Sequence, residues 1–201
     1  MTATLPAMQI GWLPDGAMVF VRPIRANDTE RLRRMFDRLS PTTVYRRFFS
    51  PIVEPRPSML QHLATVDHDR REALVALHGD EIVGVARYDG TRRPGEAEIA
   101  VTVEDAWQHR GLGTLLLHEL TKRAVAHGYD HFNASMLAEN RPAMSMLRRL
   151  APDARVALDG GSYEATIDLT RRARSARKAR DGAASAGPRR PVGQAIDEAQ
   201  A

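Results

Sequence analysis

The sequence predicts an α+β domain built on a mixed, twisted sheet that helices flank. Three observations predict this class: helices and strands follow one another without strict alternation, two neighbouring strands form a hairpin, and a long amphipathic helix connects two further strands. With 201 residues, 43% of them hydrophobic and 27% charged, the chain is long enough for one domain with a substantial core. We expect neither a second domain nor internal repeats.

Caps and prolines divide the first half of this domain into short elements. Apolar residues at 19–24 predict the first strand, and Asn27 or Asp28 can cap the helix that follows. Ser40 precedes a proline, which fits the first turn of a helix, and therefore predicts the start of a second helix. Ser58 predicts the start of a third helix after an extended, proline-containing loop.

The second half of the domain begins with strands. Residues 72–78 and 81–88 form the expected hairpin around a Gly-Asp turn, and 96–103 form another strand. The strongest helix is 111–127, where leucine and alanine recur every four residues and Gly128 can end the helix. The remaining expected elements are a strand near 131–137, a helix from Asn140 to Leu150 and a last strand at 162–169.

The positive charge of the chain lies in its C-terminal tail. The whole chain carries a formal net charge of +4, whereas residues 171–201 alone carry +5, so the rest is close to neutral. The tail is rich in Arg, Ala, Gly and Ser and lacks aromatic residues, which predicts disorder. We therefore expect a lead-in at 1–17, a folded domain at 18–170 and a disordered basic tail that binds nucleic acid weakly if at all.

The absence of cysteine excludes several kinds of chemistry. The chain has no thiolate nucleophile, no disulfide framework and no metal site built on sulfur. The seven histidines show no HExxH or other convergent spacing, so we expect no metal. No apolar run reaches the roughly 18 residues of a membrane-spanning helix, and the first thirty residues lack a signal-peptide pattern. We therefore expect a cytoplasmic protein without a membrane partner.

The segment from Glu98 to Thr114 carries the clearest chemical signal. A strand runs here into a turn that contains Gly111 and Gly113 and begins a helix. Such a turn presents unpaired backbone N–H groups and the positive end of the helix dipole, which together suit a phosphate. A dinucleotide-binding fingerprint needs a third glycine where Leu116 stands, and a Walker loop needs a lysine in place of Thr114. Neither of these common phosphate motifs fits.

The turn resembles the coenzyme A loop of the GNAT superfamily of acyltransferases. That loop reads Gln or Arg, two residues, Gly, one residue, then Gly or Ala, and Gln108, Gly111 and Gly113 match it. A second family feature follows about thirty residues later, where Asn140 opens a helix. The resemblance implies a GNAT fold with six to seven strands and four to five helices.

The resemblance extends over most of residues 18–170. The run from Leu39 to Pro51 is similar to the acceptor-side segment of the bacterial protein lysine acetyltransferase branch, the Pat-like domains. Val21-Arg-Pro-Ile24 is similar to the first strand of that branch. This resemblance implies a protein lysine as the acceptor.

Site residues follow from the same resemblance. Acetyl-CoA is implied as the cosubstrate, and Glu98 matches the glutamate on the fourth strand that the branch uses as general base. Main-chain atoms around Val101 and Val103 are implied to pair with the pantetheine arm, amides 109–114 to hold the pyrophosphate, and Asn140 to contact the cofactor near its pantetheine. The implied cofactor-binding residues are Val101, Val103, Gln108, His109, Arg110, Gly111, Leu112, Gly113, Thr114 and Asn140.

The chemistry of acetyl transfer to an amine requires a base. A lysine amine with a pKa near 10.4 attacks a thioester only when neutral, and losing its proton at pH 7 costs about 4–5 kcal/mol. Alternation along 96–103 places Glu98 on the face opposite the aliphatic residues, where a partly desolvated carboxylate can take that proton. Glu96 and Asp105 are alternatives for this role, and Glu98 can also be an ordinary exposed strand acid.

Two positions depart from the family pattern. Leu147 stands where many members carry a tyrosine that can serve as the acid for the departing thiolate, which weakens a tyrosine-acid mechanism. Ala151-Pro152-Asp153 replaces a glycine-aromatic pair, so we expect shifted or irregular final strands.

Several side chains near the turn have two interpretations. Trp107 is first a packing anchor and second a substrate contact. Arg110 and Arg141 can contact the 3′-phosphoadenosine of the cofactor or form surface salt bridges. The aromatic residues of the second helix are first a core stripe and second a wall of the acceptor pocket: Tyr45, Phe48 and Phe49.

We therefore interpret the chain as an acetyl-CoA-dependent N-acetyltransferase that acts on an amine, with a protein lysine as the expected acceptor. The first alternative is a GNAT acetyltransferase of a small-molecule amine. The second is a non-catalytic acyl-CoA-binding regulator. A nucleic-acid-binding module has only the basic tail in its favour.

Overall fold

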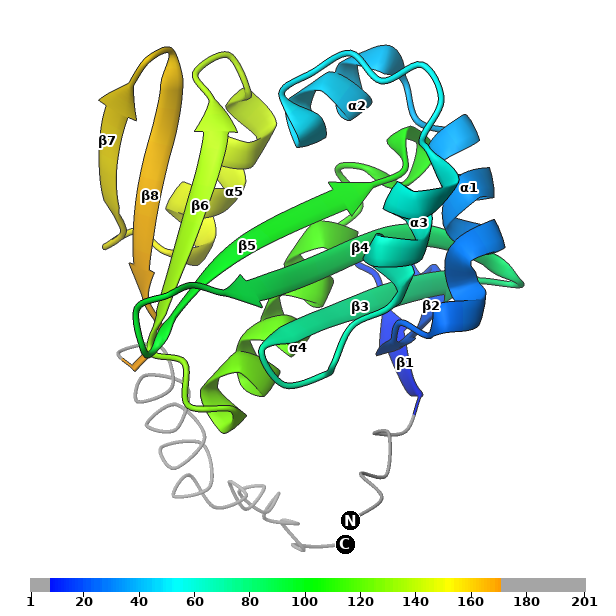
Figure 1. The fold of residues 1–201 in the computed structure, drawn as a ribbon, viewed down its shortest axis with the longest axis horizontal. Coiled ribbons are helices and arrows are strands. Elements are labelled where there is room, and N and C mark those ends of the chain that lie inside the picture. The colour runs from blue at the N-terminus through cyan, green and yellow to red at the C-terminus, as the bar shows by residue number, and fades with distance from the viewer. Residues whose placement is uncertain (1–7, 171–201) are drawn as a thin grey trace, which may run out of the picture. The chain divides into compact units, whose positions relative to one another are not determined.

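Eight strands form one sheet in the order β1-β2-β3-β4-β5-β6-β8-β7, and five α-helices pack beside it (Figure 1). The computed structural model describes residues 8–170, and the expectations for the tail at 171–201 lie outside this range. The predicted α+β class with a mixed sheet is confirmed, although the sheet has more strands than the six to seven expected.

The strands are β1 (Gln9–Trp12), β2 (Met18–Pro23), β3 (Arg71–His78), β4 (Glu81–Gly90), β5 (Glu96–Val103), β6 (His131–Leu137), β7 (Arg155–Asp159) and β8 (Ser162–Asp168). The helices are α1 (Thr29–Asp37), α2 (Pro41–Phe48), α3 (Pro57–Ala64), α4 (Leu112–Ala126) and α5 (Arg141–Leu150). Short 3-10 turns lie at Ala26–Asp28 and Asp105–Trp107.

Two strands that the sequence pattern did not predict lie at the edges of the sheet. β1 falls in the expected lead-in and pairs only with β2, and β7 pairs only with β8. All five residues of β7 are exposed, so the strand shows no apolar alternation. The hairpin of β7 and β8 is nevertheless regular from Arg155 to Asp159, so the expected irregularity of the last strands is not found.

The three helix starts predicted in the first half of the domain have different outcomes. Ser40 caps α2 as predicted, because its hydroxyl accepts from the Thr43 N–H at 3.2 Å. Ser58 does not cap α3, since the helix already begins at Pro57. Asp28 precedes α1, but its carboxylate binds a neighbouring arginine instead of a helix amide.

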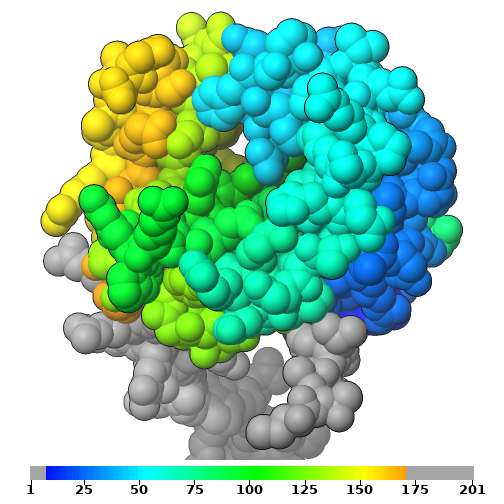
Figure 2. All heavy atoms as spheres, viewed as in Figure 1, coloured from blue at the N-terminus to red at the C-terminus, as the bar shows by residue number. Residues whose placement is uncertain are grey.

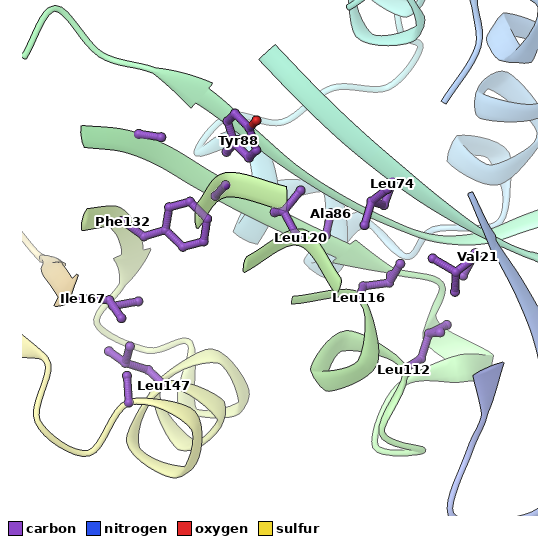
Figure 3. Packing of buried hydrophobic residues seen from close by; sticks show 14 of the residues in the cluster. Val21, Leu74, Ala86, Tyr88, Leu112, Leu116, Leu120, Phe132, Leu147 and Ile167 are labelled. Carbon is purple, nitrogen blue, oxygen red and sulfur yellow. The ribbon is translucent and has the colours of Figure 1, made fainter. Parts of the chain in front are cut away.

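The sheet separates two cores. On one face, α4 and α5 cover the larger core, and on the other face α1 and α3 cover a smaller one (Figure 1). β3 contributes to both cores because successive strand residues point to opposite faces. Each fully buried leucine in such a core contributes about 1.5–3 kcal/mol. The leucines that α4 directs at the sheet are Leu112, Leu116 and Leu120 (Figure 3).

β5 has one fully paired edge and one edge that is mostly open. Its antiparallel pairing with β4 covers seven residues, from Ala97 to Val103. Its parallel pairing with β6 covers only Glu96, Ala97 and Glu98. Beyond Glu98 the two strands diverge, and α2 lies across from the resulting gap (Figure 1). This divergence positions the candidate site.

Two further properties concern residues 8–170 only. None of the helices in this range is both long and apolar enough to cross a membrane. In the same range, no three His, Asp or Glu side chains come together as a metal site would require.

Candidate active site

The open edge of β5 presents main-chain groups to the gap. Residues along a strand direct their N–H and C=O groups alternately to its two edges. The Glu104 N–H donates to the Val83 carbonyl at 3.0 Å, on the side of β4. By alternation, Val101 and Val103 face the other side, beyond the last position at which β5 pairs with β6. The structure therefore places both predicted main-chain sites at the gap.

The turn between β5 and α4 holds a second set of free groups. Within residues 8–170, the backbone amides of 109–114 have no hydrogen-bond acceptor. His109 and Gly111 have φ values of 60° and 90°, the left-handed conformation found in anion-binding backbone turns. Gly111 is the N-cap of α4, so the next amides lie at the positive end of the helix dipole. This geometry suits an anion with several oxygens, such as a diphosphate.

Gln108 connects this turn to two other elements. Its side-chain amide donates to the Val103 carbonyl and to the Thr43 hydroxyl, both at 3.1 Å. Val103 ends β5, and Thr43 lies in the first turn of α2. The side chain of Gln108 therefore positions the turn, and the Val103 carbonyl already has a donor.

Asp105 holds the start of α2. Its carboxylate accepts hydrogen bonds from the Ser40 N–H at 2.9 Å, the Ser40 hydroxyl at 2.7 Å and the Thr43 hydroxyl at 2.8 Å. Desolvation opposes the charge, but these bonds outweigh it and lower the pKa of Asp105. A carboxylate stabilised in this way is a poor proton acceptor, which argues against Asp105 as the general base.

Glu98 lies where the two strands part. It is the last β5 residue that pairs with β6, opposite Asn133, and its side chain is exposed. It shares a face with Thr102, while Ile99 and Val101 pack toward the larger core, as alternation predicts. Glu98 is therefore more exposed to solvent than the partly desolvated carboxylate that the sequence predicted. Glu96, the other candidate, accepts a hydrogen bond from Asn133 at 3.1 Å.

The first turn of α4 contacts α5. Arg149 donates to the Thr114 hydroxyl at 3.0 Å. A Cβ added to Gly113 would lie 3.3 Å from the Met146 sulfur, so this glycine allows the close approach of the two helices. Leu112 is fully buried, which leaves only its backbone for a ligand.

α5 contributes one candidate residue and lacks another. Asn140 is its N-cap, with Oδ1 accepting from the Ala143 N–H at 3.2 Å. The Nδ2 donor of Asn140 has no acceptor within the part of the chain that the structure describes. Leu147, at the position of the family tyrosine, is buried in the larger core and offers no acid.

Arg110 and Trp107 form a surface cluster beside the turn. Arg110 pairs with Asp15, and its guanidinium lies 4.3 Å from the centre of the Trp107 ring. The centres of the Trp107 and His78 rings lie 4.8 Å apart, with the rings tilted by 50°. This agrees with the salt-bridge interpretation of Arg110 and the packing interpretation of Trp107. Arg141 is exposed.

The expected core stripe of α2 is wrong for two of its three aromatic residues. Tyr45 and Phe49 are each 41% exposed, and Val44 is the buried residue of this short helix. Phe48 is partly buried and lies 6.2 Å from the Phe36 ring. Val44 and Phe48 pack against the domain, whereas the Tyr45 and Phe49 rings are partly exposed.

A pocket that the sequence analysis did not predict lies on the same face of β5 as Glu98. Its walls come from α1, α2, α3, β4 and β5 and are mostly apolar, and it encloses about 50 Å³. Two arginines, Arg47 of α2 and Arg87 of β4, line it. The surface is hollowed where α2 meets β5 and β6 (Figure 2). The sequence signal for it is Arg87, the one charged residue in the otherwise apolar run 82–88.

A model of the acetyltransferase (GNAT) family matches residues 33–151, which is more than half of the chain. The chain belongs to the GNAT family. The matched range contains β5, the free amides of 109–114 and Asn140.

Relatives of this GNAT chain include Pat proteins. Acetyltransferase PA5475 of Pseudomonas aeruginosa is 38% identical over 133 residues, which cover 64% of this chain and 72% of that protein. Acetyltransferase Pat of Mycolicibacterium smegmatis is 32% identical over 141 residues, covering 67% of this chain and 41% of that protein. The crystal structure of the GNAT domain of S. lividans PAT has a TM-score of 0.76 at 28% identity and covers 82% of this chain and 99% of that one. The predicted resemblance to Pat-like GNAT domains is confirmed.

Proposed function

We propose that this GNAT domain transfers an acetyl group from acetyl-CoA to an amine, and that the amine is a protein lysine. One observation carries the proposal: the open edge of β5 leads directly into the free amides of 109–114. A ligand with an amide-containing arm and a diphosphate can accept hydrogen bonds from the edge of β5 and from the amides of 109–114. Membership of the acetyltransferase family supports acetyl transfer.

The strand edge offers three main-chain groups to the pantetheine arm and to the thioester at its end. Val101 offers its N–H and its carbonyl, because it lies beyond the part of β5 that pairs with β6. Val103 offers its N–H alone, since Gln108 already donates to its carbonyl. Asn140 offers its free Nδ2 group from the start of α5.

Glu98 is the proposed general base. As the C–N bond forms and the C–S bond breaks, its carboxylate takes the proton of the attacking amine directly or through one water molecule. The Val101 N–H donates a hydrogen bond to the carbonyl oxygen, which gains negative charge during the attack. The departing thiolate takes its proton from solvent, because Leu147 is buried and apolar.

The protein-lysine acceptor is the finer part of the proposal. Similarity to the two Pat proteins supports it, together with the resemblance of residues 39–51 to the acceptor-side segment of Pat-like domains. The exposed rings of Tyr45 and Phe49 flank the pocket residues of α2, and exposed aromatic side chains are enriched where proteins meet. The cytoplasmic location stays a prediction.

Two measurements on the full chain test this function. Calorimetric titration with acetyl-CoA measures binding, and mass spectrometry of protein, polyamine and aminoglycoside acceptors measures transfer. We expect binding and acetylated lysines. Turnover confined to small amines would refute the lysine acceptor, and binding without any transfer would support a regulator instead. Failure to bind acetyl-CoA would refute the function as a whole.

A further inference from the structure

Arg87 is a buried charge whose hydrogen bonds are incomplete. It is 6% exposed, yet its Nε atom has no hydrogen-bond partner in residues 8–170. Asp89 lies 3.5 Å from this nitrogen, and the Leu63 carbonyl accepts from Nη2 at a long 3.4 Å. Asp89 is shared, since it also accepts from Arg71 at 2.7 Å. A buried donor without a partner costs about 1–3 kcal/mol, so its persistence needs an explanation.

Arg47 is a second cation on the wall of the same pocket. Its guanidinium makes no hydrogen bond or ion pair with any residue of the described range and lies 4.9 Å from the centre of the Phe48 ring. Burial lowers the pKa of Arg47, and the charges of Glu98 and Asp89 oppose this effect. The guanidinium therefore lies within reach of the field of the proposed base.

The two arginines repel each other. Burial lowers the pKa of Arg87 to about 10, Asp89 opposes the shift, and Arg47 and Arg71 add to it. Within residues 8–170, Asp89 is the one carboxylate that forms an ion pair with Arg71 or Arg87, and Arg47 forms none, which leaves positive charge uncompensated by ion pairs. A carboxylate placed between Arg47 and Arg87 would neutralise this charge and give both guanidinium groups an acceptor.

We propose that the pocket binds a carboxylate of the acceptor, an acidic side chain that flanks the target lysine. This inference rests on the proposed function. Arg87 pairs with Ala100 across the two strands, two residues from Glu98, so the carboxylate subsite lies about 7 Å along β5 from the base. The pocket is small and its walls are mostly apolar, which suits a short acidic side chain whose methylene groups contact those walls. Lysine and acid then occupy neighbouring positions on one strand face.

Matched peptides test the subsite in the full chain. Each peptide carries one lysine with either glutamate or glutamine at one flanking position, and the positions are scanned in turn. We expect kcat/KM with acetyl-CoA to be at least about tenfold higher for the best glutamate peptide than for its glutamine counterpart. Arg47→Gln and Arg87→Gln should each bring this ratio close to one. Arg155→Gln on β7 makes the same charge change on an exposed edge strand and should leave the ratio intact.

A binding measurement separates this inference from the proposed function. The same peptides, labelled and with the lysine already acetylated, report affinity by fluorescence anisotropy without any turnover. A glutamate preference that Arg47→Gln removes supports the subsite even if no acceptor is acetylated. Equal affinity for both peptides, or a preference that survives both arginine variants, would overturn it. Since Arg47 is only partly buried, its variant remains informative if Arg87→Gln fails to fold.

A second experiment identifies the source of the carboxylate. Free lysine carries its own carboxylate at the far end of the amine-bearing chain, and lysine amide lacks it. We expect both to be poor acceptors with similar rates. Strong turnover of free lysine that depends on Arg47 would overturn the flanking side chain as the source and assign the subsite to a small amino acid.

Discussion

Two buried arginines on the same side of the sheet have opposite surroundings. Arg22 of β2 is 7% exposed and donates two hydrogen bonds to Asp28, each of 2.7 Å, and a third to the Pro23 carbonyl at 2.9 Å. Asp28 also accepts from the Arg25 N–H at 2.8 Å. Arg87 is buried to the same degree but has one nitrogen without a partner.

Polar groups that are fully paired, such as Arg22 and Asp28, stabilise the fold. Polar groups that are incompletely paired, such as Arg87, are available to a ligand. The pair of Arg22 and Asp28, the closed corner, joins β2 to the start of α1 and satisfies its own charges. The open region combines the arginine pocket, the unpaired edge of β5 and the amides of 109–114. Changes in the closed corner should therefore reduce stability, and changes in the open region should reduce function.

The largest effect is expected for Asp28→Ala. It leaves Arg22 charged and buried without a counter-ion, which typically costs about 3–5 kcal/mol of unfolding free energy. Arg87→Met removes an incompletely bonded charge and keeps an apolar stem, so its cost should stay within about 1 kcal/mol. Urea unfolding of both variants measures the contrast. Equal losses of unfolding free energy in the two variants would contradict the proposed difference between Arg22 and Arg87.

Glu98→Gln should give the next largest effect, and on activity alone. Removal of a general base lowers the rate by about 10²-fold, which corresponds to about 2.7 kcal/mol of transition-state stabilisation. Affinity for acetyl-CoA and unfolding free energy should not change, because the Glu98 side chain is exposed. Steady-state kinetics and calorimetry measure the two quantities.

Glu96→Gln is the matched control for this substitution. Glu96 lies on the same face of β5 and already binds Asn133. We expect nearly normal rates for this variant. A loss of rate in Glu96→Gln with none in Glu98→Gln would move the base to Glu96.

The parts of the molecule that the sequence predicted are those with local causes. The turn at Gln108–Thr114 depends on glycine spacing within one segment, and the start of α2 depends on Ser40 and its following proline. The open edge of β5 could not be predicted from the residue pattern, because it depends on where β5 and β6 stop pairing. Arg47 and Arg87 line the same pocket only because α2 packs on the sheet. The sequence around either residue does not predict that they come together.

Gly111→Ala should have a smaller effect that appears in both stability and binding. Gly111 has a φ of 90°, and an added Cβ would lie 2.9 Å from Pro14, so the turn must shift. A left-handed conformation costs a residue with a Cβ about 1–2 kcal/mol. We also expect about tenfold weaker binding of acetyl-CoA, measured by calorimetry, because the amides of 109–114 move.

Gly128→Ala provides the control at the other end of α4. Gly128 has a similar φ of 84°, but an added Cβ would meet no atom within 4 Å. This variant should lose a similar amount of stability and keep its affinity for acetyl-CoA. If both alanine variants weaken binding equally, the amides of 109–114 are not the diphosphate site.

The smallest effect is expected for Asp105→Asn. This residue lies near the open region, but its carboxylate already accepts hydrogen bonds from Ser40 and Thr43. The pKa of Asp105 is lowered, so its contribution to stability is present above the usual pKa of about 3.9 and is lost as the pH falls below it. Because Asp105 is exposed, we expect the variant to lose only about 0.5–1 kcal/mol at pH 7. The difference between wild type and variant should then shrink as the pH falls from 5 to 3. Urea unfolding at a series of pH values measures this, and a difference that grows toward low pH would contradict the hydrogen bonds from Ser40 and Thr43 as its cause.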